Sequence, residues 1–122
     1  MMHVEEIRDY CLKKPCATES TPFDEVTLVF KVCEKMFALV PLDEVDCKIT
    51  LKCEPEEAIR LREQYPAAVV SAWHFNKKHW NTVIVPNAPG RRQVEQWIDD
   101  SYDLVVAGFT RKQKELLKQA GG

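Results

Sequence analysis

The fold class is decided by the stretch Cys47-Lys48-Ile49-Thr50-Leu51-Lys52-Cys53, in which apolar and polar residues alternate strictly. Successive side chains of a β-strand point to opposite faces, so this strand covers one face of a sheet and leaves the other to solvent. A sheet with one wet face is typical of an antiparallel sheet with helices on one side. A doubly wound parallel sheet would be covered on both faces.

The flanking segments predict the other elements. Apolar residues at helical spacing, each run ended by a proline or glycine, predict helices at about 3–14, 55–65 and 91–107, and Thr110 begins a capping box for a tail helix to about 119. Residues rich in β-branched and aromatic side chains predict further strands at 26–32, 35–40, 67–73 and 80–85, with a loop holding Pro15 and Pro22. The sequence therefore predicts an α+β domain in two layers. Its single five-stranded, mainly antiparallel sheet carries helices on one face, in the order helix, three strands, helix, two strands, helix, short tail helix.

Composition predicts one soluble domain over residues 1–122. The chain is 45% hydrophobic and 30% charged, as in ordinary globular proteins, and no apolar run approaches the roughly 20 residues that span a bilayer. Residues 1–14 interleave acidic and basic side chains with apolar ones, unlike a signal peptide, so we expect a cytoplasmic protein without a membrane partner. The net charge of −2 argues against a non-specific nucleic-acid coat, so any phosphate binding would need a local basic patch.

Signals of catalysis and metal binding are weak. The five cysteines, Cys11, Cys16, Cys33, Cys47 and Cys53, are odd in number and include no CxxC pair, so they are expected to be free thiols. Cys47 and Cys53 share the apolar parity of the opening strand and are expected to be core residues, whereas Cys16 is the thiol expected to be most exposed. The chain has only four glycines and no GxSxG, HExxH or EF-hand motif. We therefore expect no enzyme, no catalytic residue, no metal and no cofactor.

The strongest functional signal is the stretch WHFNKKHWNT at residues 73–82, which holds two lysines, two histidines and three large aromatic residues. Rings beside cations suit anionic, stackable ligands such as nucleic acid. The alternative is a β-hairpin whose aromatic residues pack in the core and whose Asn76-Lys77-Lys78 is a solvated turn. Trp80 shares its strand parity with Ile84 and is expected to be largely buried.

A second basic group follows the third long helix. That helix runs back roughly 25 Å at 1.5 Å per residue, so it could return Arg111 and Lys112 towards Lys77, Lys78 and His79. The five side chains would then form one positive patch. The alternative is a lysine-rich, solvated tail helix.

Several segments together resemble the MmcQ/YjbR family of small bacterial proteins, over about residues 3–107. The matching segments are TLVFKV (27–32), KMFAL (35–39), LKC (51–53), LREQYP (61–66), NKKHWNTV (76–83) and SYDLVV (101–106). The resemblance implies a compact α+β fold similar in architecture to type III secretion chaperones. The family is commonly described as DNA-binding, with a "double wing", and has no defined catalytic site. Its motif maps onto Asn76, Lys77, Lys78, His79, Trp80 and Asn81.

The chain departs from the family in two places. Cys33-Glu34 stands where glycines are typical, which makes the first hairpin turn stiffer, and residues 110–122 extend past the family core. The resemblance therefore says nothing about the tail.

Two functions remain open. The first is a nucleic-acid-binding domain that uses Asn76, Lys77, Lys78, His79, Trp80 and Asn81 together with Arg111 and Lys112. The second is a protein-interaction adaptor that uses the sheet face or an apolar groove near the long helix. Exposure of the aromatic residues distinguishes the two, and the sequence leaves the ligand and the oligomeric state open.

Overall fold

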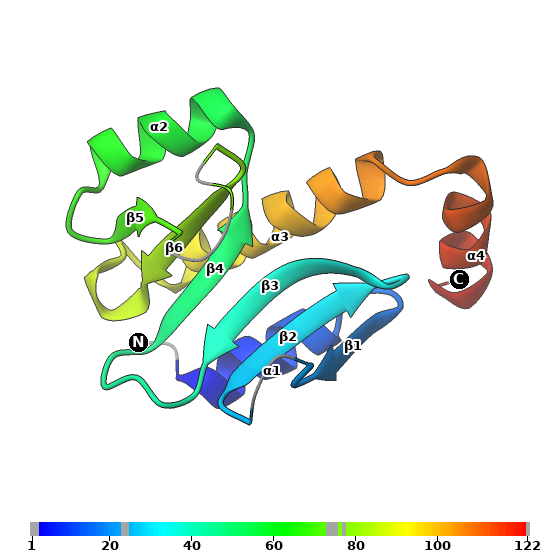
Figure 1. Cartoon of the computed structure of the whole chain (residues 1–122), viewed down its shortest axis with the longest axis horizontal. Helices are drawn as coiled ribbons and strands as arrows, with labels where there is room; N and C mark the ends of the chain where they lie inside the picture. Colours follow the sequence, from blue (N-terminus) through cyan, green and yellow to red (C-terminus); the bar gives the residue numbers. More distant parts are fainter. Residues whose placement is uncertain (1–2, 23–24, 73–75, 77, 122) are drawn as a thin grey trace.

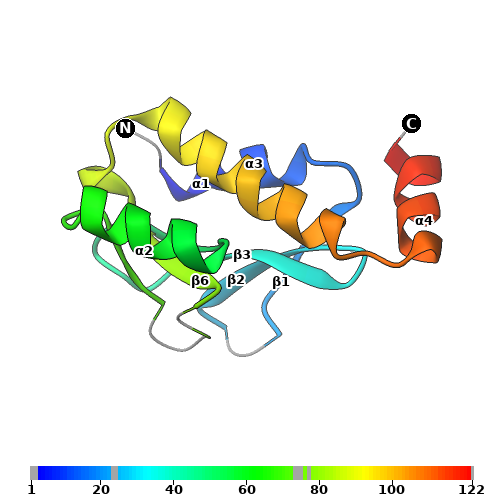
Figure 2. The ribbon, with the colours of Figure 1, turned by 90° about the horizontal axis from the view of Figure 1, so that it is seen from above.

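The structure, a computed structural model, describes residues 3–22, 25–72, 76 and 78–121. Three helices, α1 (Val4–Leu12), α2 (Pro55–Gln64) and α3 (Arg91–Ala107), cover one face of a single antiparallel sheet (Figures 1 and 2). A fourth helix, α4 (Arg111–Gly121), stands off the body beyond the end of α3. The predicted α+β class, with two layers and the helices on one face, is confirmed.

Six strands form the described part of the sheet, in the spatial order β1-β2-β3-β4-β6-β5. They are β1 (Ala17–Ser20), β2 (Thr27–Val32), β3 (Lys35–Pro41), β4 (Lys48–Lys52), β5 (Val69–Ser71) and β6 (Trp80–Ile84), and a 3-10 turn, η1 (Val85–Asn87), leads towards α3. Every neighbouring pair is antiparallel. Short connections join the consecutive strands of four of these pairs, whereas α2 and β5 lie between β4 and β6 in the chain.

The prediction of five strands is wrong by one, because β1 lies where a loop was expected. Its sequence ATES has no large apolar residue, so it carries no strand signal of its own. It forms the sheet edge by pairing with β2, and Arg8 of α1 holds it through two hydrogen bonds of 2.6 and 2.5 Å to the Glu19 carboxylate. A short polar strand is a common way to end a sheet.

The core lies between the sheet and the helices. Phe30 of β2, Phe37 of β3, Ile49 of β4 and Ile98 of α3 are fully buried there. Ser101 of α3 is also fully buried, where it accepts a hydrogen bond of 2.8 Å from the Lys52 backbone N–H and donates one of 2.6 Å to the Phe37 carbonyl. One hydroxyl thus ties α3 to two neighbouring strands.

The face of β4 that was expected to be exposed to solvent is accessible only at the two ends of the strand. Lys48 and Lys52 are half-buried, but Thr50 is 8% exposed and shares a hydrogen bond of 2.8 Å with Thr82 on β6. Its other neighbour, Leu39 of β3, is 3% exposed, so the middle of the face opposite the helices is shielded from solvent. Strict alternation on one strand could not reveal what the neighbouring strands place beside it.

Candidate functional site: a groove between α2 and α3

The basic turn is only partly described. Trp73, His74, Phe75 and Lys77 lie outside the described residues, so the expected stacking of Trp73 or Phe75 cannot be placed. Asn76, Lys78 and His79 are exposed just before β6. The Asn76 side chain accepts a hydrogen bond of 2.9 Å from the Lys78 backbone N–H. The Asn76 backbone carbonyl accepts hydrogen bonds of 3.0 Å from the backbone N–H groups of His79 and Trp80. Asn76 therefore shapes the turn.

The two residues that begin β6 differ from their predicted roles. Trp80 is half-buried rather than largely buried. Asn81 is 3% exposed, donates a hydrogen bond of 3.2 Å to the Ala58 carbonyl and accepts one of 2.7 Å from Arg62. Strand alternation points Asn81 towards α2, so this amide joins β6 to α2 and is not available as a nucleic-acid contact.

The predicted joint patch of Lys77, Lys78 and His79 with Arg111 and Lys112 is not formed by the described residues. Arg111 and Lys112 are exposed at the start of α4, where Arg111 lies 3.6 Å from Glu115. Figures 1 and 2 both place α4 on the far side of the molecule from β5 and β6. The length of α3 was estimated correctly, but α3 crosses the sheet obliquely and packs on β3 and β4. Its end is therefore directed away from β6.

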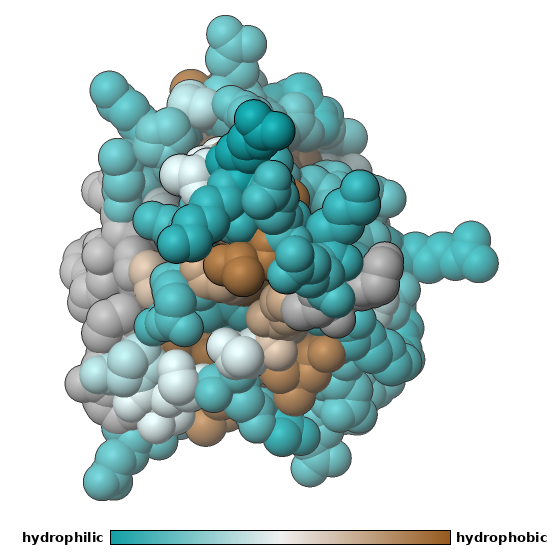
Figure 3. Space-filling model, turned by 90° about the vertical axis from the view of Figure 1, so that its right-hand side faces the viewer, coloured by the Kyte–Doolittle hydropathy of each residue, from teal (hydrophilic) through white to brown (hydrophobic). Residues whose placement is uncertain are grey.

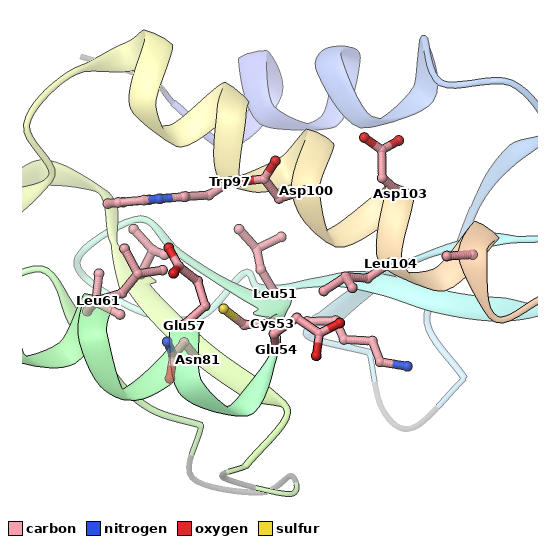
Figure 4. A pocket seen from close by; sticks show the side chains of 14 residues that line it. Leu51, Cys53, Glu54, Glu57, Leu61, Asn81, Trp97, Asp100, Asp103 and Leu104 are labelled. Carbon is pink, nitrogen blue, oxygen red and sulfur yellow. The ribbon is translucent and has the colours of Figure 1, made fainter.

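A groove of about 450 Å³ lies between α2 and α3, above β4 and β6. Figure 4 shows Leu51, Leu61, Trp97 and Leu104 around it, with Cys53 in their midst. Together with Val69 and Val83 they make an apolar lining. The sequence had suggested an apolar groove near the long helix only as part of the second functional hypothesis, and the structure confirms that such a groove exists.

Four carboxylates line the same groove. Glu54 and Glu57 come from the start of α2, and Asp100 and Asp103 come from α3 (Figure 4). Neither the two glutamates nor the two aspartates are among the site residues predicted from the sequence. The missed signal is that Trp97, Asp100, Leu104 and Ala107 recur at spacings of three, four and three, which places them along one side of α3.

The motif at residues 76–81 reaches the end of this groove. A neighbouring depression of about 340 Å³ is lined by Asn76, His79 and Trp80. It shares the side chains of Lys52, Cys53, Glu54 and Leu104 with the groove. The basic turn and the acidic groove are thus parts of one continuous surface.

The carboxylates differ in how far they are neutralised. Glu57 pairs with Arg60, whose hydrogen bond holds the pKa of this carboxyl below its ordinary value, and Asp100 accepts a hydrogen bond of 2.9 Å from Gln96. Among the described residues, neither Glu54, Asp100 nor Asp103 has an ion-pair partner. Burial, followed by the negative charges of Glu57 and Asp100, raises the pKa of the Cys53 thiol to about 11. The negative potential of the rim therefore reaches the floor of the groove.

The cysteines are free, as expected, but Cys47 and Cys53 are half-buried rather than core residues, and Cys11 is the fully buried one. In the described part of the chain, no three His, Cys, Asp or Glu side chains are grouped as metal ligands would be. No helix described by the structure is long and apolar enough to cross a membrane.

Comparisons with known proteins place these features in a family. The model of the YjbR family matches residues 12–104. The uncharacterized protein YjbR of Escherichia coli K12 is 33% identical over 118 residues, which cover 97% of this chain and 99% of that protein. The uncharacterized protein YbdF of Escherichia coli O157:H7 is 27% identical and is aligned over 93% of both chains.

Solved structures agree with this assignment. The crystal structure of Deinococcus radiodurans protein DR2400, described as domain DUF419, superposes with a TM-score of 0.90 at 33% identity, covering 97% of this chain and 89% of that one. A crystal structure of a Pseudomonas syringae protein gives a TM-score of 0.72 at 27% identity, over 84% of this chain and 98% of that one. The near full-length match and the shared fold show that the chain belongs to the YjbR family.

Proposed function

We propose that the chain is a non-catalytic cytoplasmic adaptor that holds a segment of a partner polypeptide in the groove between α2 and α3. The observation that carries this proposal is the apolar lining enclosed by carboxylates from both helices. Its volume of about 450 Å³ falls within the roughly 300–1,000 Å³ typical of ligand sites. A surface of this kind suits side chains that are apolar in the middle and cationic at the edges.

The partner segment that fits is an amphipathic helix with leucine-like residues on one face and Lys or Arg beside them. Trp97 and Ala107 both line the groove, and ten residues of α3 extend roughly 15 Å, which is between two and three helical turns. Helices commonly dock their apolar face into grooves of this length. Glu54 and Glu57 on one rim, with Asp100 and Asp103 on the other, would meet cations on both edges of such a helix.

The test uses a synthetic leucine–lysine amphipathic peptide, with a leucine–glutamate peptide of the same pattern as its control. We expect fluorescence anisotropy to detect binding of the first peptide only. The double variant Asp100→Lys, Asp103→Lys should weaken binding by at least about tenfold, because two favourable charge contacts become repulsive.

The matched control is Asp43→Lys, an exposed charge reversal in the loop before β4 that lies outside the groove. It should leave the affinity unchanged. Equal binding of both peptides, or equal loss with Asp43→Lys, contradicts the proposal. Concentration-dependent self-association that the same double variant abolishes would identify the partner as a second copy, presenting its own basic α4.

Nucleic acid is the second candidate, and it is supported by the exposed Lys78 and His79 beside the half-buried ring of Trp80. Few cations converge there, so the slope of log affinity against log salt should be shallow, with a magnitude of about two to four. The double variant Lys77→Glu, Lys78→Glu should abolish binding to duplex and single-stranded oligonucleotides in an anisotropy titration while leaving the melting temperature nearly unchanged. Binding that survives this change contradicts the assignment.

A further inference from the structure

We propose that Cys16 and Cys33 form a redox-sensitive dithiol, which closes into a disulfide and clasps the start of β1 to the turn between β2 and β3. This site lies at the sheet edge and is independent of the groove. Its basis is the pairing of the two strands, the backbone conformation at both cysteines and their shared partial exposure.

The strand register brings the two cysteines to the same end of the β1–β2 ladder. The last pair of that ladder is Ala17 of β1 with Val32 of β2, and Cys16 and Cys33 are the residues directly beyond it. Disulfides span Cα separations of about 4.4–6.8 Å, and the Cys16 side chain lies close enough to share a hydrogen bond with the Cys33 thiol. The two thiols are therefore near enough to be joined.

The backbone at both positions is one that ordinary residues avoid. Cys16 has a φ of 60° and Cys33 a φ of 46°, both in the left-handed region that favours glycine. Cys33 and Glu34, at 69°, form the two-residue turn between β2 and β3, where two positive φ values are typical of a type I′ turn. A residue with a β-carbon is strained at such a φ. Both of these neighbouring strained positions are occupied by cysteine.

The two thiols also interact directly. Burial raises the pKa of the Cys33 thiol, and the charge and hydrogen bonding of Cys16 raise it further. Both side chains are half-buried, so a small oxidant can reach them, whereas Cys11 is fully buried. Because the raised pKa of Cys33 disfavours its thiolate, we assign the first attack to Cys16.

The chemistry is a two-step exchange with a small-molecule disulfide such as glutathione disulfide. The Cys16 thiolate attacks one sulfur of the oxidant, which forms a mixed disulfide and releases one thiolate. The Cys33 thiolate then attacks the Cys16 sulfur of that mixed disulfide, which forms the Cys16–Cys33 bond and releases the second thiolate. The two cysteines together lose two electrons and two protons, and the oxidant becomes two thiols.

Closing the bond would fix a segment that α3 already holds. The Tyr102 hydroxyl donates a hydrogen bond of 2.6 Å to the Pro15 carbonyl, immediately before Cys16. A disulfide here would close the chain between residues 16 and 33, which restricts the unfolded state and should raise the melting temperature of the oxidised form.

The experiment is a titration of the whole chain in glutathione redox buffers, followed by mass spectrometry of proteolytic peptides. We expect two of the five thiols to be lost together, a mass loss of two hydrogen atoms and one cross-linked peptide pair, Cys16 with Cys33. The oxidised protein should melt at a higher temperature, and dithiothreitol should reverse the change.

Variants sharpen the test. In the Cys33→Ser variant the reaction should stop at a mixed disulfide between glutathione and Cys16, and the melting temperature should not rise. The control variant Cys47→Ser should behave as the wild type. A cross-link to any other cysteine, a stable glutathione adduct on the wild type, or no oxidation in buffers that oxidise ordinary dithiols would overturn the proposal. The peptide map of the wild type decides the matter even if a variant folds poorly.

Discussion

The two flanks of α3 both carry aspartates, but the surroundings of these aspartates differ. On the flank facing α1, Asp99 accepts a hydrogen bond of 2.7 Å from the Tyr10 hydroxyl and pairs with Lys14. The Lys14 ammonium also lies 5.2 Å from the ring centroid of Tyr10 and 5.7 Å from that of Tyr102. On the flank facing α2, Asp100 and Asp103 border the groove without an ion pair among the described residues. Neighbouring aspartates on one helix thus serve folding on one side and remain available for binding on the other.

The two flanks also differ in what lies beside α3. The α2 flank is closed only at one end, where the Tyr65 and Trp97 rings meet edge to face at 5.4 Å and Asn81 joins Arg62 to β6. Towards Leu104 and Ala107 the groove stays open. The open end of the groove is where a partner could enter. On the side of the molecule that carries α4, Figure 3 shows apolar surface gathered in the middle, surrounded by hydrophilic side chains.

The largest effect is expected at the closed end of the groove. Trp97 is 7% exposed and packs on Tyr65, so Trp97→Ala should cost about 3–5 kcal/mol of unfolding free energy, as truncation of buried aromatic residues does. Leu104→Ala at the open end should cost less, because the Leu104 side chain is already partly exposed. Urea unfolding measures both, and equal losses would show that the two ends are packed alike.

The next effect concerns the hydroxyl beneath α3. Ser101→Ala removes the partner of the Lys52 N–H and of the Phe37 carbonyl together, and leaving such groups unpaired should cost about 1–3 kcal/mol. Ser20→Ala, at an exposed position of β1, is the control and should stay within about 0.5 kcal/mol of wild type. A neutral Ser101→Ala would mean that α3 is held by apolar packing alone.

The direct test of the two flanks is a pair of isosteric changes. Asp99→Asn weakens hydrogen bonding to Tyr10 and removes the charge paired with Lys14, so it should cost about 1–2 kcal/mol. Asp103→Asn should change the unfolding free energy by less than about 0.5 kcal/mol, and it should lower the affinity for the leucine–lysine peptide. If the two variants lose equal stability, the division of α3 into a folding flank and a binding flank is wrong.

The elements of this fold could be predicted because they depend on local pattern. α3 begins and ends at the expected residues, and β4 lies inside the expected strand. The strand β1 could not be predicted, because its stability comes from Arg8 on another element and from pairing with β2.

The site was predicted only in part, for a similar reason. Residues 76–81 were found, but the role of Asn81 depends on Arg62 and Ala58, and the groove depends on the angle between two helices. The basic residues 77 and 78 stood out because they are adjacent in sequence. The acidic rim is assembled from residues about fifty positions apart, so no local pattern shows it.

The last prediction involves no substitution and compares the reactivity of two thiols, one on each flank of α3. Cys11 of α1 is fully buried, and burial raises its pKa to about 12, whereas the half-buried Cys53 in the groove has a pKa of about 11. Reagent can reach the half-buried Cys53 but not the fully buried Cys11, so Cys53 should react faster with iodoacetamide in the folded protein. The leucine–lysine peptide should slow labelling of Cys53, resolved by peptide mass spectrometry, and leave Cys11 unaffected, because only Cys53 lies beneath the bound helix. If the peptide protects both thiols equally, it acts by stabilising the whole fold, and the groove is not where it binds.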